Sequence, residues 1–361
     1  MVHVVIHTPD VVGTRMAGPG IRAFHLAEEL AKHVPTTLIA KREGEFANVV
    51  EHGSAEARAA LRDATILIGQ PARGFRKRRR AQRIVYDLFD PAVLELRELY
   101  GSHPSPRQRV HLAAEWWRLS EALLTADLLI CAARKQREFY ERLQGGEAPW
   151  IEVPFGIERE ERRACEKPRD NVIVWGGGLW EWLDPAAAVE AVVRVNRRGL
   201  RAKLLFLGRG RPNRNLIDRR RDDRFDALLA RGGAHVSAND EWVPYRERLA
   251  WLRAGKIAIM LHRRTAEAEY SIRTRLFDAI AAGTPVIASA GGFAAELVGH
   301  EGLGIVVPAE EPEAVAEAIE RLLTDDEFHA ACVQNLERIR PRFAWDLVTK
   351  PLVRAILQWQ T

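Results

Sequence analysis

The sequence predicts an α/β protein with two tandem Rossmann-like domains, each a doubly wound parallel sheet, facing each other across a cleft. Short, continuously apolar runs alternate with amphipathic helical patterns, as expected for parallel strands covered by helices. The alternation stops at the hydrophilic residues 158–170 and then starts again. A chain of 361 residues with 47% hydrophobic residues also exceeds what one core usually supports. We expect domains at residues 1–157 and 158–340, and a C-terminal helical segment at 341–361 that packs back toward the first domain.

The first domain begins with a strand and continues in alternation. Its expected strands are Val2–His7, Thr36–Ala40, Thr65–Ile68, Ile84–Leu88 and Leu128–Ala132. Its expected helices are Gly20–His33, His111–Thr125 and Lys135–Leu143. This order of elements implies a parallel sheet covered by helices.

The second domain repeats this pattern. Its expected strands are Val172–Trp175, Lys203–Leu207, Ala234–Ser237, Ile257–Leu261, Pro285–Ala288 and Gly304–Val307. Its expected helices are Pro185–Arg197, Asn213–Leu229, Tyr245–Ala254, one that Ser271 caps and Gly283 ends, and Glu313–Leu323. The tail after Pro341 carries a large apolar load and should form one or two helices. Ligands of such sheets bind at the carboxyl edges of the strands.

Composition excludes several classes of protein. No stretch reaches about 18 uncharged apolar residues, and the N-terminus enters a strand directly, so we expect neither a membrane span nor a secretory signal. Cys131, Cys165 and Cys332 are widely spaced and indicate reduced thiols in a cytoplasmic protein.

The formal net charge of +5 is too small to indicate a nucleic-acid partner, and no zinc-ligand or aromatic RNA-binding pattern supports one. The basic residues are nevertheless concentrated in two runs, Arg73–Arg83 and Arg209–Arg224. Either run could touch an anionic surface, which would place the protein at the inner face of a membrane. A solvated loop or helix face is the simpler interpretation of both runs.

The segment Glu267–Ser289 is the most informative part of the chain, because it reads as a polar loop, a helix and a buried strand. Free backbone N–H groups at the start of such a helix lie beside the carboxyl edge of the sheet, where a phosphate is held. The predicted groups belong to Ser271, Ile272, Arg273 and Thr274. Arginines 273 and 275 stand at the positive pole of this helix, where a cation is unfavourable by about 0.3–1 kcal/mol, which suggests that an anion fills the site. A solvated helix face is the alternative.

The two arginines are expected to have different roles, because residues two apart on a helix point in different directions. Arg273 is nearer the open end of the helix and is the predicted phosphate ligand. Arg275 is expected to meet a carboxylate in the body of the domain.

These motifs resemble those of the glycosyltransferases of the two-Rossmann-domain (GT-B) type, family 4 in particular, over essentially the whole chain. The run Leu276–Ala288, LFDAIAAGTPVIA, looks like that family's acidic-Ala-x-Ala-x-Gly-x-Pro-Val signature. The resemblance implies that Asp278 binds the ribose hydroxyls of a nucleotide. It also implies a Glu for the donor sugar eight positions earlier, where Tyr270 stands. Glu269, one position off, is our candidate; Glu267 is the alternative, and a surface carboxylate is the simpler interpretation of either.

The run Trp175–Pro185 is similar to the strand, glycine turn and helix that open the donor domain in this family. Gly177 and Gly178 would let the backbone approach a ligand, and Trp180 would form a wall for a sugar or base, or pack in the core. The Arg and Lys that most members carry in this turn are missing. We expect the diphosphate charge to be met by candidates elsewhere in the chain, namely Arg209, Arg263, Arg273 and Arg275.

In the first domain, Gly18, Pro19, Gly20 and Arg22 resemble the glycine-rich turn that closes over the donor phosphates and the acceptor. The family's usual active-site His is not evident near the middle of this domain. Asp87 and Asp90 stand there and are expected to hold sugar hydroxyls, and Asp90 joins Glu269 as a candidate catalytic residue. His7 and His25 remain as alternatives, with structural roles more common for such residues.

We interpret the chain as a transferase that moves a sugar from a nucleoside diphosphate donor to an unknown hydroxyl acceptor, in polysaccharide or glycoconjugate biosynthesis. The resemblance implies retention of anomeric configuration and no metal, and no cofactor is expected. A nucleotide-sugar epimerase on the same architecture is one alternative. A non-catalytic sugar-nucleotide sensor or basic scaffold is another. A dinucleotide dehydrogenase is disfavoured, because no Gly-x-Gly-x-x-Gly follows the first strand of either domain.

Overall fold

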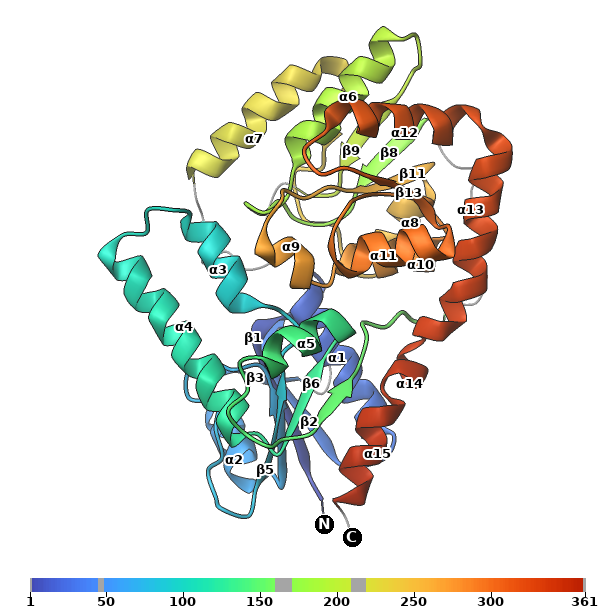
Figure 1. Ribbon diagram of the computed structural model, residues 1–361. Helices are drawn as coiled ribbons and strands as arrows, with labels where there is room; N and C mark the ends of the chain where they lie inside the picture. The colour runs from blue at the N-terminus through green and yellow to red at the C-terminus, as the bar shows by residue number, and fades with distance from the viewer. Residues whose placement is uncertain (1, 45–48, 160–170, 209–218, 360–361) are drawn as a thin grey trace. The chain divides into compact units, whose positions relative to one another are not determined.

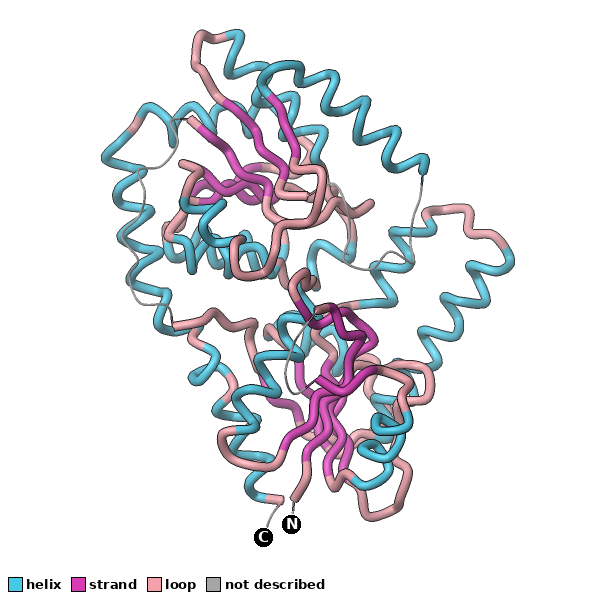
Figure 2. Tube along the Cα trace, turned by 180° about the vertical axis from the view of Figure 1, so that it is seen from behind, coloured by secondary structure: helices cyan, strands magenta, loops and turns pink. Residues whose placement is uncertain are grey.

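The computed structural model describes residues 2–44, 49–159, 171–208 and 219–359, with only the backbone at 219–222. Contacts divide the chain into two compact units (Figure 1). Unit 1 comprises Met1–Gly156, Tyr270–Ile272 and Phe343–Thr361, and unit 2 comprises Ile157–Glu269 and Arg273–Arg342. In each unit the strands form an inner layer with helices around them (Figure 2).

Unit 1 contains a seven-stranded sheet with the order β3-β2-β1-β4-β5-β6-β7, and its neighbouring strands are parallel. The strands are β1 (Val4–Gly13), β2 (Thr36–Glu43), β3 (Val49–Glu51), β4 (Ile66–Gly69), β5 (Arg83–Asp87), β6 (Leu128–Cys131) and β7 (Trp150–Glu152). The helices are α1 (Gly18–Ala31), α2 (Ala55–Asp63), α3 (Ala92–Tyr100), α4 (Pro106–Thr125), α5 (Arg134–Glu141), α14 (Trp345–Val348) and α15 (Lys350–Gln358). The strand order reverses between β1 and β4, which opens a crevice at their carboxyl ends.

Unit 2 contains a six-stranded parallel sheet with the order β10-β9-β8-β11-β12-β13. The strands are β8 (Val172–Trp175), β9 (Lys203–Phe206), β10 (Val236–Ala238), β11 (Ile257–Met260), β12 (Val286–Ser289) and β13 (Gly304–Val307). The helices are α6 (Pro185–Arg197), α7 (Arg219–Gly232), α8 (Arg248–Arg253), α9 (Ala266–Tyr270), α10 (Thr274–Ala282), α11 (Gly292–Glu301), α12 (Pro312–Thr324) and α13 (Asp326–Ile339). Short 3-10 turns lie at Gly233–His235 and Arg340–Phe343. Here the order reverses between β8 and β11.

The apolar runs form the central strands. Both faces of a parallel sheet are covered by helices, so every residue of such a strand is buried. The residues of β4, β6, β8, β11 and β12 are all buried. The two doubly wound parallel sheets are therefore confirmed. Gly283 ends α10 as expected, with a left-handed backbone at φ 72°.

The C-terminal residues pack into unit 1 through Trp345. Its ring is stacked on His25, with 4.9 Å between the ring centroids, and it fills the space beside Gly156, where a Cβ would lie 2.3 Å from the indole. His25 is thus a packing residue, as its structural interpretation expected. In the described part of the chain, no helix has both the length and the apolar character needed to cross a membrane.

Candidate functional site

The glycine turn Gly176–Gly178 follows β8 at the point where the strand order of unit 2 reverses. Gly177 has φ +80°, a conformation that favours glycine. A Cβ at Gly178 would lie 3.2 Å from the ring of Trp242 and 3.4 Å from Nε1 of Trp180. The turn is therefore enclosed by two indole rings. Trp180 also stacks on Trp182, with 5.3 Å between centroids, so it contributes to packing as well as to the wall of the turn.

Arg275 reaches this glycine turn from α10. Its Nη2 donates a hydrogen bond to the carbonyl oxygen of Gly178 over 3.0 Å, and its guanidinium lies 5.3 Å from the ring centroid of Trp175. Its Nη1 is buried and meets no acceptor within the described residues. Burial and the nearby charge of Arg273 lower the pKa of Arg275 to about 9, so it remains a cation at neutral pH. A cation with an unsatisfied donor beside a glycine turn suits a phosphate oxygen.

Arg273 does not occupy the position that we predicted for it. Its Nη1 and Nη2 donate to the two carboxylate oxygens of Glu267, each over 2.7 Å, and the side chain of Glu267 is 0% exposed. A buried carboxylate needs such a partner because an uncompensated charge is costly to bury. The predicted roles of the arginines are therefore reversed, since Arg273 neutralises a carboxylate and Arg275 lies at the glycine turn. Both carboxylate oxygens of Glu267 are engaged by Arg273, which favours Glu269 over Glu267 as the predicted ligand for the donor sugar.

The predicted cap of this helix is also wrong. Helix α10 begins at Thr274, its N-cap residue is Arg273, and no side chain caps it. Ser271 and Ile272 are buried in the segment that precedes the helix. The start lies two residues further along the chain than predicted, because the Glu267–Arg273 pair holds this segment outside the helix. Of the four N–H groups that we predicted to bind phosphate, only that of Thr274 belongs to the first turn.

Glu269 and His262 meet beside Gly291, at the carboxyl ends of β11 and β12. A Cβ on Gly291 would lie 3.7 Å from Oε2 of Glu269 and 3.6 Å from the His262 ring. Oε2 of Glu269 accepts a hydrogen bond of 3.3 Å from the backbone N–H of Gly292, the first residue of α11. The carboxylate of Glu269 therefore lies at the positive pole of a helix, where a negative charge is attracted. Burial and the charge of Arg273 lower the pKa of His262, so the imidazole is neutral at neutral pH.

Asp278 lies one turn into α10 and is partly exposed. Its Oδ1 accepts a 2.8 Å hydrogen bond from Nε of Arg248. Arg248 lies 3.7 Å from the ring centroid of Tyr245, whose hydroxyl donates to Glu158 over 2.8 Å. Asp278 therefore neutralises Arg248 through Oδ1. Its Oδ2 makes no hydrogen bond to the described residues and is available to a ligand hydroxyl.

Of the two remaining arginines predicted to meet the diphosphate, the structure describes only one. Arg263 is exposed just beyond β11, and its backbone N–H donates to the carbonyl of Trp182 over 2.9 Å. Arg209 lies outside the described residues. Sequence reasoning missed Trp242 and His262; their positions just beyond the carboxyl ends of β10 and β11 were the only available indication.

The predicted glycine-rich turn of unit 1 is instead the first turn of α1. Gly18 opens this helix, and a Cβ on Gly20 would lie 2.3 Å from the carbonyl oxygen of Val11, so glycine allows α1 to approach β1. Arg22 is 1% exposed. Its Nε and Nη2 donate to the carboxylate of Asp87 over 2.7 and 3.1 Å, and Nη1 donates to Val153 over 2.9 Å. Arg22 and Asp87 are therefore a buried structural pair, which corrects their predicted contact with phosphates and sugar hydroxyls.

Asp90 lies just beyond β5 and keeps an available carboxylic group. Gln70, beyond β4, donates to Oδ2 of Asp90 over 3.2 Å, and the Tyr140 hydroxyl donates to its backbone carbonyl over 3.2 Å. Burial raises the pKa of Asp90 to about 8, and the charges of Asp10 and Asp87 add to this effect. A carboxyl group with a pKa near neutral can exchange a proton with a substrate hydroxyl.

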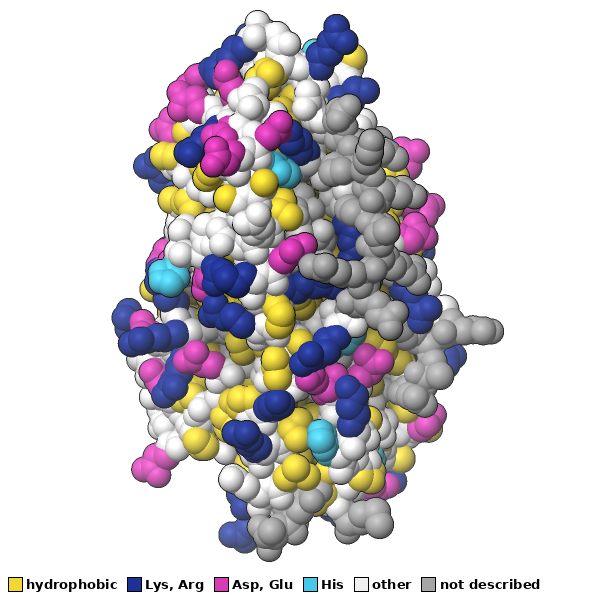
Figure 3. Space-filling view, turned by 90° about the vertical axis from the view of Figure 1, so that its right-hand side faces the viewer, with side chains coloured by type: hydrophobic (Ala, Val, Ile, Leu, Met, Phe, Trp, Pro, Cys, Tyr) yellow, Lys and Arg dark blue, Asp and Glu magenta, His cyan; other side chains and the backbone are white. Residues whose placement is uncertain are grey.

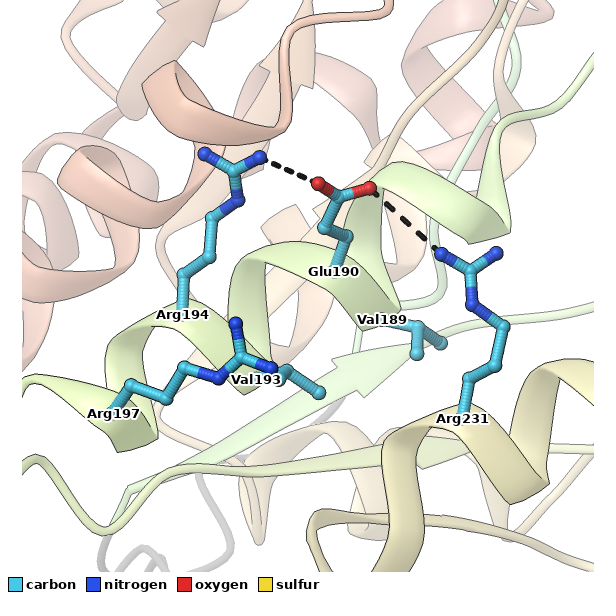
Figure 4. A pocket seen from close by; sticks show the side chains of 6 residues that line it. All are labelled: Val189, Glu190, Val193, Arg194, Arg197 and Arg231. Carbon is cyan, nitrogen blue, oxygen red and sulfur yellow. Dashed lines mark hydrogen bonds and ion pairs between the residues drawn. The ribbon is translucent and has the colours of Figure 1, made fainter.

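A separate hollow of about 400 Å³ lies between α6 and α7, away from the strand ends (Figure 4). It is lined by Val189, Glu190, Val193, Arg194, Arg197 and Arg231. Arg194 and Arg231 both face the carboxylate of Glu190, at 2.5 and 4.0 Å. We interpret it as a surface hollow bordered by ion pairs. Throughout the described residues, no three His, Cys, Asp or Glu side chains are grouped as a metal site would require.

Comparisons with known proteins agree with this architecture. Residues 170–325 match the family described as glycosyl transferases group 1. A stretch of 77 residues is 35% identical to an uncharacterized glycosyltransferase of Methanocaldococcus jannaschii, covering 21% of this chain and 20% of that protein. The alignment thus spans about a fifth of that relative's length.

Two solved structures resemble the chain over nearly its whole length. Sucrose-phosphate synthase of Thermosynechococcus elongatus has a TM-score of 0.72 at 16% identity, covering 100% of this chain and 99% of its own. HepE of Anabaena, solved in complex with UDP-glucose, has a TM-score of 0.72 at 14% identity, covering 99% and 100%. The fold is therefore that of the GT-B glycosyltransferases. The match of residues 170–325 to the glycosyl transferases group 1 model agrees with the resemblance found in the sequence.

Proposed function

We propose that this protein transfers a sugar from a nucleoside diphosphate sugar to a hydroxyl acceptor, with retention of configuration and without a metal ion. The observation that carries the proposal is Arg275, a half-buried cation beside the glycine turn that follows β8; its buried Nη1 meets no acceptor among the described residues. HepE, which has the same fold, was solved with UDP-glucose, and this supports a nucleotide-sugar donor here. In this proposal unit 2 holds the donor and unit 1 the acceptor.

Each donor group then has a physical role. Arg275 and the N-terminus of α10 stabilise the negative charge that develops on the departing diphosphate, and such electrostatic stabilisation is usually the largest catalytic term. Oδ2 of Asp278 accepts from a ribose hydroxyl. Glu269 faces the sugar from the N-terminus of α11, with neutral His262 beside it. Trp242 and Trp180 border the diphosphate turn.

On the acceptor side, Asp90 replaces the histidine that is usual in this family. With a pKa of about 8, Asp90 is mainly a neutral acid at neutral pH. Its ionised fraction orients the acceptor hydroxyl and takes up its proton as the new glycosidic bond forms. The buried Arg22–Asp87 pair positions the strand end from which Asp90 projects.

Thermal-shift measurements with UDP-, GDP-, dTDP- and ADP-sugars test the donor. We expect one base to raise the melting temperature clearly, since a ligand present at 100 times its Kd stabilises the fold by about 2.7 kcal/mol. The acceptor distinguishes the reactions, because a transferase releases nucleoside diphosphate in step with glycosylation of its acceptor. Conversion of the donor sugar without an acceptor would instead identify an epimerase, and the absence of any shift would contradict donor binding.

A further inference from the structure

Helix α4 presents apolar side chains on the side that faces away from its own domain. The helix is fixed at its start by a capping box, in which Ser105 and Gln108 exchange hydrogen bonds of 2.8 and 3.3 Å. Leu119, Ala122 and Leu123 form its buried side. The opposite side carries Val110, Trp117 and Leu124, whose exposed fractions are 71%, 64% and 60%.

These three residues lie on one side of the helix, because seven residues make about two turns. The half-buried Glu121 lies on the same side, between Trp117 and Leu124. We call the three apolar residues the α4 stripe; the stripe runs for about 21 Å, since each residue rises about 1.5 Å. Ala113 lies on the same side and is exposed, and Trp116 borders the stripe with 37% of its surface exposed. Monomeric soluble proteins rarely line up large apolar side chains on the solvent side of a helix, so the stripe indicates a contact surface.

Positive charge surrounds both ends of the stripe. Arg107 and Arg109 are exposed at its start. At its other end, Nζ of Lys77 and Nη1 of Arg83 bind Asp127, two residues beyond α4, over 2.7 and 3.2 Å. This contact brings the basic loop, residues 73–83, to the end of the helix. The loop contains seven Lys and Arg residues and no acidic residue: Arg73, Arg76, Lys77, Arg78, Arg79, Arg80 and Arg83.

The charge of these residues selects the partner. Two copies of the stripe, paired parallel or antiparallel, would bring one basic end against another, so self-association is opposed by like charges. Indole rings favour the boundary between apolar and aqueous phases, and basic residues attract anionic lipid headgroups. On the face shown in Figure 3, by contrast, basic and acidic side chains are interspersed. Helix α4 lies beside α3 in unit 1 (Figure 1), and its exposed tryptophan stands between the two groups of cations. This combination suits an anionic bilayer better than a second copy of the chain.

We infer that the α4 stripe and the basic loop together bind an anionic membrane surface peripherally. The stripe inserts Trp117 and its apolar neighbours at the level of the headgroups, while the arginines hold the lipid phosphates. This surface belongs to unit 1 alone, and the inference does not depend on which donor unit 2 binds. If the proposed transferase binds a membrane in this way, its acceptor is expected to be held at the membrane as well.

Vesicle co-sedimentation of the full chain tests the inference. We expect binding to vesicles of equal parts phosphatidylglycerol and phosphatidylcholine to exceed binding to phosphatidylcholine alone by at least about tenfold, and to fall as salt is added. The triple variant Val110→Ser, Trp117→Ser, Leu124→Ser should lose about tenfold or more in vesicle affinity. Its matched control is Val306→Ser, an exposed apolar residue of unit 2 that should leave binding unchanged.

A second pair of variants tests the charge. Arg76→Glu with Arg78→Glu should weaken binding about tenfold or more, whereas Arg197→Glu with Arg201→Glu, an equal change of charge in unit 2, should have little effect. Equal binding to both kinds of vesicle, or unchanged binding of the triple variant, would overturn the inference. So would a chain that is dimeric in solution and becomes monomeric in the triple variant without vesicle binding, because the stripe would then be an interface between copies.

Discussion

Arg273 and Arg275 stand two residues apart, yet their guanidinium groups have different partners. Arg273 is held by both oxygens of the buried Glu267, and Arg275 by a carbonyl of the glycine turn. The first arginine is electrically neutralised, whereas the second has no carboxylate partner among the described residues. Each has one buried donor without a partner there, Nε of Arg273 and Nη1 of Arg275. For this reason Arg275 is the residue whose charge a diphosphate would neutralise.

A prediction at the same scale concerns Asp90, whose pKa is raised to about 8 by burial and by the charges of Asp10 and Asp87. A carboxyl group with a folded-state pKa above its unfolded value stabilises the fold below about pH 4, and that contribution is lost as the pH rises toward 8. Asp90→Asn removes this loss. The variant should therefore gain stability relative to the wild type between pH 4 and 8, measured as denaturant midpoints across this range.

Asp10→Asn is the matched control for Asp90, because it removes one of the charges that raise this pKa. It should reduce the loss of stability with pH and leave part of it. If the stability of Asp90→Asn and of the wild type follow the same pH dependence, Asp90 has an ordinary pKa and is not the proton acceptor proposed here.

From the sequence, the residues that lie at the site were easier to predict than the side chains that each of them contacts. Asp278 and Glu269 were found through a motif, and both lie at the carboxyl side of the second sheet. The pairing of Glu267 with Arg273 could not be predicted, because it depends on a non-helical turn between them. The Arg22–Asp87 pair joins residues 65 apart in sequence, and no local pattern reports such a contact.

At the scale of elements, the segment between β11 and α10 is held by the Glu267–Arg273 pair. The two residues of this pair are six apart in sequence, with Glu269 between them. Both side chains are at least nine-tenths buried. The pair therefore fixes where α10 begins and where Glu269 meets α11.

Breaking this pair should destabilise the protein. Glu267→Gln or Arg273→Met alone leaves one buried charge without a partner and should cost about 3–5 kcal/mol. The double variant leaves neither charge and should recover a large part of that loss. A double-mutant cycle of denaturant unfolding measures the coupling, and additive losses would show that the two side chains do not depend on each other.

Most elements could be predicted because they follow the two periodicities of strands and helices. Pro185–Arg197 and Val172–Trp175 were predicted to the residue. Strands β3 and β7 were missed because three residues at the edge of a sheet carry too little pattern. Helix α13, Asp326–Ile339, was missed although Asp325 caps it with a 2.9 Å hydrogen bond to Phe328. The predicted helix Asn213–Leu229 lies partly outside the described residues, and its described part, α7, begins at Arg219.

At the scale of the whole molecule, two sheets of the same design carry different chemistry at their switch points. The switch point of unit 1 presents acidic and amide groups, Asp90 and Gln70, which suit sugar hydroxyls. The switch point of unit 2 presents a glycine turn, a helix N-terminus and Arg275, which suit a diphosphate. We therefore assign the acceptor to unit 1 and the diphosphate to unit 2 as a proposal.

Calorimetry on Arg275→Gln tests whether unit 2 binds the diphosphate at Arg275. The two ligands are the nucleoside diphosphate of the sugar that gives the largest thermal shift, and its nucleoside without phosphates; Arg263→Gln, which changes an exposed arginine, is the control. We expect Arg275→Gln to weaken diphosphate binding by about 1.5–3 kcal/mol and to leave nucleoside binding unchanged, because a charge-assisted hydrogen bond to phosphate is lost. Equal losses for both ligands, or a larger loss in Arg263→Gln, would contradict the assignment of the diphosphate to the glycine turn and Arg275.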